Sequence, residues 1–204
     1  IVLTNTFGCN RVRLARHHLE ERVAELNLAG ARNARAEADA AAHPVVIAGS
    51  IGPTGVMLVP YGDLEYEEAV DIFAEQAQAL IAGGVDVLWI ETMSALEEVD
   101  AAAEGCRRAE PTFPIVTTLT FDTKGRTMMG ATPEKALQTL DPLQVVALGA
   151  NCGNGPDEIE AVIQKMHTQN PSDVLIAKAN AGLPRMTDTG PVYDATPEVM
   201  AEYA

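Results

Sequence analysis

The chain has 204 residues, 47% of them apolar and 21% charged, which is typical of one globular domain with a sizeable core. Its 29 acidic and 14 basic residues give a formal net charge of −15, so the surface repels phosphate backbones and anionic lipids, and nucleic acid and membrane partners are disfavoured. No uncharged apolar run reaches the roughly 18 residues needed to span a bilayer.

Short apolar runs alternate with longer helical patterns along the whole chain. The predicted strands are residues 1–7, 44–50, 85–91, 115–121, 145–150 and 174–180. The predicted helices are residues 14–42, 66–82, 95–108, 133–140 and 158–167. Two helix starts are marked, by Ser94 with Glu97 in a capping-box pattern and by Thr132 as N-cap before Pro133. Nearly continuous apolar runs indicate parallel strands buried on both faces.

The spacing of these elements predicts an α/β fold. The last four strands recur every 30 residues or so, about the repeat of an eight-unit (β/α)8 TIM barrel, so an incomplete barrel with about six strand-helix units is expected. A doubly wound open sheet is the structural alternative, although no Gly-x-Gly-x-x-Gly fingerprint opens the first helix. Residues 1–7 read as a strand already under way, and residues 200–204 stop within a helical pattern. Both ends are therefore expected to be cuts.

Polar residues stand at the C-terminal ends of the predicted strands, where barrels of this class carry their chemistry. They are Thr4 to Thr6, Ser50, Glu91 with Thr92, Thr120 to Asp122, Asn151 with Cys152, and Lys178 to Asn180. A carboxylate, a thiol and several amides and hydroxyls on one rim predict a polar pocket.

The three cysteines differ in their surroundings. Cys152 follows an apolar run and precedes a glycine-rich turn and a helix start, a position that favours thiolate for zinc binding or nucleophilic attack. A small cysteine packed under a loop remains the alternative. Cys106, in mid-helix, and Cys9, in a loop, are interpreted as structural. Three widely spaced cysteines form no disulfide framework, which favours a reducing cytoplasm.

Glu91 is the charged residue best placed at a strand end. It can orient an ammonium group, hold a proton or cap the helix that follows. Trp89 shares its face by alternation and is expected in the core. The four histidines lie in or beside predicted helices, so a histidine metal site or catalytic triad is disfavoured.

Six motifs in register carry a resemblance. They are TNTFG at residues 4–8, GSIGPTG at 49–55, IET at 90–92, FD with GRTMMG at 121–130, GANC at 149–152 and NAGLP at 180–184. Together they resemble the homocysteine S-methyltransferase family, which includes the homocysteine domain of cobalamin-dependent methionine synthase. The bacterial betaine–homocysteine methyltransferase-like branch is the most similar.

The resemblance implies a homocysteine-binding barrel domain over residues 1–204, truncated at both ends. It implies one Zn²⁺ held by Cys152 and by two further cysteines beyond residue 204. Glu91 would bind the amino group of homocysteine, and Thr4 would help to hold its carboxylate. Asn151 and Asn180 are counted with the substrate-binding residues, and Glu91 and Cys152 are the catalytic candidates.

The implied reaction moves a methyl group from a donor to the thiolate of homocysteine, giving methionine. Two tyrosines that cage betaine in the family would map near Gly8 and onto Thr92, and neither position is aromatic here. The methyl donor therefore stays open: it is betaine held by other residues such as Phe7 or Tyr61, a sulfonium compound, or a methylated corrinoid or folate. The expected partners are these small molecules, with a homo-oligomer as a further option. The alternatives are a barrel lyase or isomerase acting on a phosphorylated molecule, with residues 180–184 as phosphate loop, and an inactive truncated product.

Overall fold

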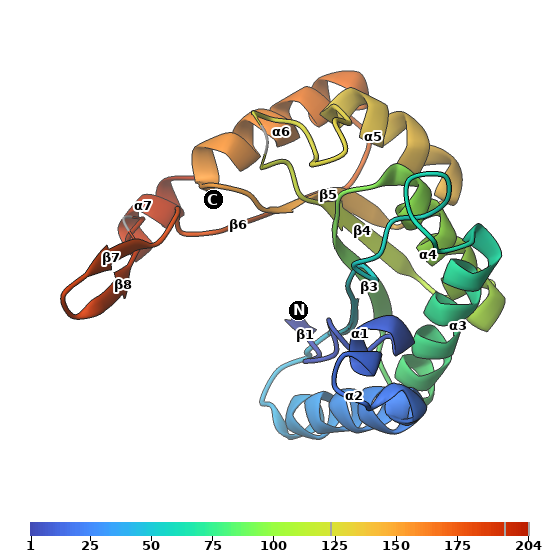
Figure 1. Ribbon diagram of the computed structural model, residues 1–204. Coiled ribbons are helices and arrows are strands. Elements are labelled where there is room, and N and C mark those ends of the chain that lie inside the picture. The colour runs from blue at the N-terminus through green and yellow to red at the C-terminus, as the bar shows by residue number, and fades with distance from the viewer. Residues whose placement is uncertain (123, 194, 204) are drawn as a thin grey trace.

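Six parallel strands form a curled sheet in the computed structural model, which describes residues 1–122, 124–193 and 195–203. The strands are β1 (Val2–Leu3), β2 (Ile47–Ile51), β3 (Val87–Met93), β4 (Ile115–Leu119), β5 (Ala147–Cys152) and β6 (Leu175–Ala179). They lie side by side in sequence order, and every neighbouring pair is parallel. Figure 1 shows the sheet as an open arc with the helices on its convex side.

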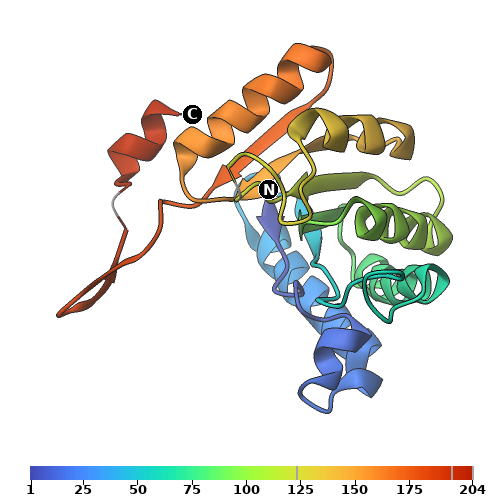
Figure 2. The same cartoon turned by 45° about the horizontal axis from the view of Figure 1, so that its top comes forward.

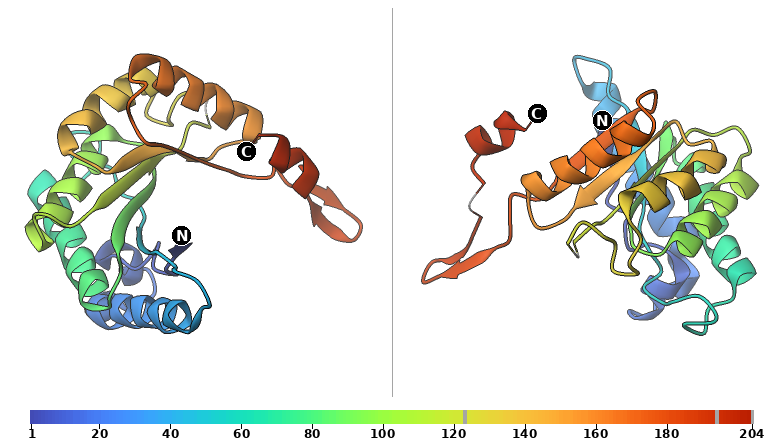
Figure 3. Two further views of the ribbon diagram at one scale, coloured as in Figure 1. Left: turned by 180° about the vertical axis from the view of Figure 1, so that it is seen from behind. Right: turned by 90° about the horizontal axis from the view of Figure 1, so that it is seen from above.

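This architecture confirms the prediction of an incomplete barrel. A doubly wound sheet reverses its strand order and carries helices on both faces. Here the order runs from β1 to β6 without reversal, and the view from behind in Figure 3 keeps the helices outside the arc. The doubly wound alternative is therefore wrong. β1 and β6 are the two edges of the arc, whereas a closed barrel of this class has eight strands.

The helices agree with the predicted ranges in the middle of the chain. Their bounds are α1 (Arg11–Ala15), the 3₁₀ turn η1 (Glu20–Arg22), α2 (Val23–Ala40), α3 (Tyr66–Ala82), α4 (Leu96–Ala109), α5 (Pro133–Leu140), the 3₁₀ turn η2 (Asp141–Leu143) and α6 (Pro156–Gln169). The ranges predicted at 66–82 and 133–140 are confirmed. The single helix predicted at 14–42 is wrong, because the chain turns at His18, whose φ of 57° is left-handed, before α2 begins.

The two predicted helix caps have different outcomes. Thr132 caps α5 as predicted, because its hydroxyl accepts a hydrogen bond from the backbone N–H of Lys135 at 3.2 Å. The predicted capping box at Ser94 is wrong. α4 begins at Leu96, its N-cap is Ala95, and no side chain caps it.

Two apolar layers hold the arc together. The larger layer lies between the sheet and the helices and includes Phe73, Leu88 and Ile115, all with 0% exposure. The smaller lies on the concave face, and it consists of Ala48, Val87, Trp89, Val116 and Ala147, with Leu3 and Ile176 packed against them. The concave layer supports the strand ends from below, which is where the polar residues emerge.

The last described residues leave the sheet. A hairpin of β7 (Arg185–Thr187) and β8 (Gly190–Val192) is followed by α7 (Pro197–Glu202). The hairpin was not predicted, whereas α7 overlaps the helical pattern expected at residues 200–204. Figures 1 and 2 show the hairpin projecting away from the arc. No helix in the described part of the chain is both long and apolar enough to cross a membrane.

Candidate active site at the strand ends

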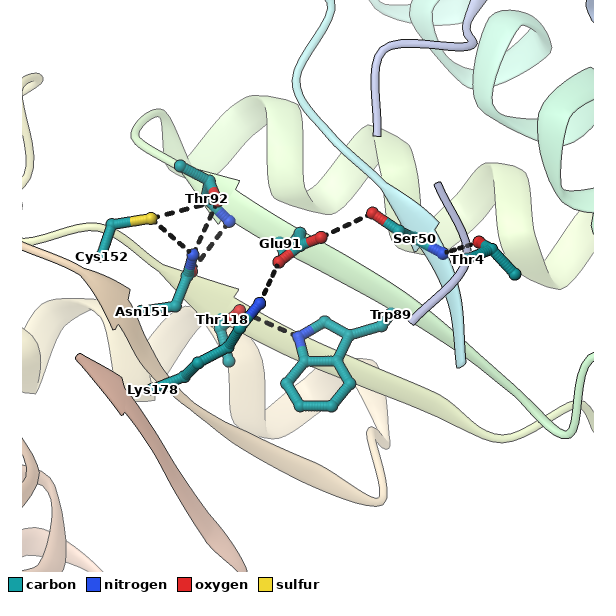
Figure 4. A network of polar contacts seen from close by, with 9 residues as sticks. All are labelled: Thr4, Ser50, Trp89, Glu91, Thr92, Thr118, Asn151, Cys152 and Lys178. Carbon is teal, nitrogen blue, oxygen red and sulfur yellow. Dashed lines mark hydrogen bonds and ion pairs between the residues drawn. The ribbon is translucent and has the colours of Figure 1, made fainter. Parts of the chain in front are cut away.

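Polar side chains from β2 to β6, together with Thr4 just after β1, form the network in Figure 4. One half is built around the carboxylate of Glu91, and the other around the thiol of Cys152. The two halves meet on β3, where Glu91 and Thr92 are consecutive residues. The predicted gathering of a carboxylate, a thiol, amides and hydroxyls is therefore present in the fold.

Glu91 is a buried carboxylate with two donors. Its side chain is 9% exposed. The hydroxyl of Ser50 on β2 donates to Oε1 at 2.5 Å, and the ammonium of Lys178 on β6 donates to Oε2 at 3.1 Å. α4 has no side-chain cap, so Glu91 does not act as the helix cap that its position also allowed.

Lys178 and Trp89 lie beside the Glu91 carboxylate on the concave face of the sheet. The Lys178 Nζ atom lies 6.0 Å from the centroid of the Trp89 ring, close enough for a cation–π contact. The indole N–H of Trp89 donates to Thr118 Oγ1 at 3.0 Å, which satisfies its polar atom inside the concave layer. Trp89 is a core residue, as predicted. Lys178 was predicted at a strand end, but its pairing with Glu91 was not predicted.

Thr4 holds the end of β1 against β2. Its Oγ1 accepts from the backbone N–H of Ser50 at 2.9 Å and lies 2.6 Å from Thr6 Oγ1. The Thr6 hydroxyl donates to the Ser50 carbonyl at 2.8 Å. Thr4 is only 5% exposed, so its hydroxyl positions Ser50 and, through Ser50, Glu91.

Asn151 organises the thiol half of the network. Its Oδ1 accepts from the backbone N–H of Thr92 at 2.9 Å. Its Nδ2 donates to Thr92 Oγ1 at 2.7 Å and to Cys152 Sγ at 3.1 Å. The residue is 1% exposed, so these internal contacts occupy its amide. Asn151 therefore positions Cys152 relative to β3, and its predicted contact with substrate stays a prediction.

Two left-handed residues mark the same place. Thr92 has φ 62° and Cys152 has φ 63°, although neither is glycine. Such a conformation costs about 1–3 kcal/mol and is concentrated at functional sites. At Thr92 it coincides with a shift of register between β3 and β4. The hydrogen bonds of Asn151 to both residues hold this strained arrangement in place.

Cys152 is half-buried. The Asn151 amide donates to its Sγ at 3.1 Å, and the Thr92 hydroxyl lies 3.8 Å from the same sulfur. The backbone N–H of Asn180 donates to the Cys152 carbonyl at 3.0 Å, and Asn180 Nδ2 donates to the Gly153 carbonyl at 3.1 Å. Asn180 thus fixes the turn that carries the thiol.

Comparison with known proteins decides the family. The model of the family described as homocysteine S-methyltransferase matches residues 1–204. The chain belongs to the homocysteine S-methyltransferase family. The methionine synthases of Mycobacterium tuberculosis and Mycobacterium leprae are each 33% identical to it, over 98% and 99% of this chain. It spans 17% of the length of each of these two relatives.

Solved structures show the same fold. The metallated form of the homocysteine methyltransferase MmuM from Escherichia coli superposes with a TM-score of 0.73 at 23% identity, covering 88% of this chain and 66% of that one. Its apo form gives a TM-score of 0.62 at 24% identity, covering 78% and 60%. The curled sheet of this family member is therefore the barrel architecture of MmuM over the shared region.

The other cysteines of this family member lie outside the network. Cys106 is fully buried in α4, and burial raises the pKa of its thiol to about 12. Burial also raises the pKa of Cys9, which is half-buried in the loop before α1. Within the described ranges no group of three or more His, Cys, Asp or Glu residues could hold a metal ion. Among the three cysteines, Cys152 is thus the one whose sulfur takes part in the network.

A groove of about 380 Å³ opens among the loops that follow β2, β3 and β4. Its wall includes Met57, Tyr61, Met128 and Met129, all with exposed side chains. Glu98 also lines the groove, and it is 6% exposed. Burial raises the pKa of its carboxyl, whereas hydrogen bonds from the backbone N–H and the hydroxyl of Thr54 act to lower this pKa.

The two aromatic candidates for holding betaine do not share this groove. Tyr61 lines it, whereas Phe7 is not among its lining residues. The Phe7 ring already faces the guanidinium of Arg13, whose Cζ is 5.6 Å from the ring centroid. The structure does not bring Phe7 and Tyr61 together as one aromatic cage.

Proposed function

We propose that the whole protein transfers a methyl group from a small-molecule donor to the thiolate sulfur of homocysteine, giving methionine. Membership of the family supports this reaction over a lyase or isomerase acting on a phosphorylated molecule. The observation that carries it is the placement of a buried carboxylate, Glu91, and a half-buried thiol, Cys152, on one rim of the sheet and in one network.

Each half of the network has a role in this reaction. Glu91 would bind the ammonium group of homocysteine through Oε2, because Ser50 already occupies Oε1. Thr4 and Asn180 would support the binding end by fixing Ser50 and the turn after β5. Asn151 would hold the Cys152 thiol toward the place where the acceptor sulfur is bound. This arrangement orients the acceptor before the methyl donor arrives, which is a large part of the catalytic gain in group transfer.

Zinc is part of the proposal. Cys152 would be one of three cysteine ligands, and the other two would come from outside residues 1–204. A zinc ion bound in this way holds the substrate sulfur as thiolate, the form that accepts a methyl group. The Asn151 amide, which donates to the Cys152 sulfur, would hold that sulfur in position for the metal.

The groove favours a donor that needs no aromatic cage. Tyr61 is the single aromatic residue among the described residues that line it, and recognition of a trimethylammonium group uses several aromatic faces. We therefore place a sulfonium compound or a methylated corrinoid ahead of betaine. Methionine formation with each donor in turn is the measurement that separates them.

Replacement of Cys152 by serine tests the proposed function. In the full-length protein Cys152→Ser should lower zinc content and homocysteine methylation together, because a neutral hydroxyl replaces a thiolate ligand. Cys9→Ser is the matched control, since Cys9 takes no part in the network, and it should retain both. Zinc is measured by elemental analysis and methionine by chromatography. A folded Cys152→Ser protein that keeps its zinc and its activity would show that Cys152 is only structural.

A further inference from the structure

The outward oxygen of Glu91 is already covered. Ser50 occupies Oε1, and the Lys178 ammonium sits on Oε2 at 3.1 Å. The Glu91 side chain is 9% exposed, which leaves little of the carboxylate open to a ligand. If a substrate ammonium is to reach Glu91, the ammonium of Lys178 has to move aside.

Lys178 is built to move in this way. Its side chain is 48% exposed and ends in a flexible four-carbon stem. Its backbone is fixed, because Lys178 pairs with Asn151 in the β5–β6 ladder and the next residue pairs with Cys152. The ammonium can therefore leave Glu91 while its point of attachment stays beside the thiol.

The arrangement complements a zwitterion. Glu91 and Lys178 present one negative and one positive group side by side, whereas an α-amino acid carries an ammonium and a carboxylate on one carbon atom. Insertion of the amino acid exchanges one ion pair for two. A ligand with an ammonium but no carboxylate would leave the displaced Lys178 without a partner, and an unpaired charge of this kind discriminates between ligands.

Thr4 is poorly placed for the carboxylate. Its hydroxyl is 5% exposed and is engaged by the Ser50 N–H and by Thr6. Lys178 is the cation that bonds to Glu91 among the described residues, and it is half exposed. A carboxylate next to a Glu91-bound ammonium would meet Lys178 first.

We propose that Lys178 is a specificity residue that pairs with Glu91 in the free protein and with the α-carboxylate of the amino-acid acceptor in the complex. The inference rests on the proposed function for the identity of the acceptor. Lys178 makes the site selective for thiols that carry an intact amino-acid group.

The experiment compares two acceptors in the full-length protein, homocysteine and its decarboxylated analogue. Lys178→Met keeps a side chain of similar length without the charge, Lys178→Arg keeps the charge, and Lys165→Met at an exposed position of α6 is the matched control. Calorimetric Kd values and kcat/KM are measured for each acceptor, together with zinc content.

The expected result is weaker binding of homocysteine without weaker binding of its decarboxylated analogue. Lys178→Met should weaken binding of homocysteine by about three- to tenfold, because a half-exposed charged contact is lost. Binding of the decarboxylated analogue should be unchanged or tighter, since its competitor for Glu91 is gone. Lys178→Arg should restore most of the discrimination, and Lys165→Met should leave both acceptors unaffected.

Two outcomes would overturn the inference. Equal losses for the two acceptors in Lys178→Met would assign Lys178 a structural role, and tighter binding of homocysteine would make it only an occupant of the empty site. Failure of the wild-type protein to methylate homocysteine with any donor would instead contradict the proposed function. These results are separable, because the ratio of the two Kd values tests Lys178 without turnover.

Discussion

Removal of the Glu91 charge is the sharpest test of the carboxylate half of the site. Glu91→Gln keeps the size of the side chain and its Oε1, which can still accept from the Ser50 hydroxyl. The change removes the negative charge that faces Lys178 and, in the complex, the substrate ammonium. The fold should be preserved, because Lys178 is half exposed and pairs of that kind stabilise proteins by less than about 1 kcal/mol.

The effect on catalysis should be much larger than the effect on stability. A hydrogen bond to a charged group contributes about 1.5–3 kcal/mol, and each 1.36 kcal/mol is a factor of ten, so kcat/KM for homocysteine should fall by about 10- to 150-fold. Most of the loss should enter KM, because the ammonium is bound in the ground state as well as in the transition state. Glu91→Ala should lose at least as much, since Ser50 and Lys178 then lose their partner.

The assay uses the full-length protein with a saturating methyl donor and varied homocysteine. Zinc content is measured in parallel and should stay near the wild-type level, because within the described part of the chain Glu91 bonds to Ser50 and Lys178 and not to the thiol half of the network. Glu110→Gln is the control, since Glu110 is an exposed residue at the opposite end of α4. An unchanged kcat/KM in a folded, zinc-loaded Glu91→Gln protein would refute the assignment of Glu91 to the amino group.

Two further substitutions test the parts of the structure around this site. Asn151→Ala should lower the unfolding free energy by about 1–3 kcal/mol in urea, because it leaves the half-buried N–H of Thr92 without its acceptor. It should also lower zinc content, because Cys152 loses its donor. Unchanged stability would contradict the role of Asn151. Glu98→Gln should raise the unfolding free energy near neutral pH and have little effect at acid pH. Burial raises the pKa of Glu98, so its carboxyl keeps its proton to higher pH in the folded state than in the unfolded state. The stability of the wild-type protein therefore falls as pH rises through the raised pKa. An equal effect of the substitution at both pH values would contradict this account.

The sheet could be predicted from the sequence because its strands are buried on both faces. The apolar runs at residues 85–91 and 115–121 coincide with β3 and β4 within two residues at each end. The first strand is much shorter than its run, because after the backbone bond from Thr4 to Ala48 the hydroxyls of Thr4 and Thr6 take the places of ladder bonds at Ser50. The break at His18 could not be predicted, because a left-handed turn of one residue leaves no trace in the periodicity.

The candidate site was only partly predictable. Polar residues at strand ends predicted which residues meet, because parallel strands of a barrel end on the same rim. The pair of Lys178 with Glu91 depends on the curl of the sheet, since β4 and β5 lie between their strands. The position of Ile176 could have indicated the direction of the Lys178 side chain, because Ile176 lies two residues earlier on β6 and packs against the concave layer. Lys178 must then face the same interior.

Consecutive residues on two strands contribute to one site, which regular strands do not allow. Side chains of a strand alternate between its faces, so neighbours such as Glu91 and Thr92 should point to opposite sides. The left-handed conformation of Thr92 and the shift of register beside it bring both side chains into the network, and Cys152 follows Asn151 by the same means. Asn151 bonds to both left-handed residues. The backbone strain therefore has a structural effect: it brings the Cys152 thiol on β5 to Thr92, the residue that follows Glu91 on β3, and one buried amide fixes the two strand ends relative to each other.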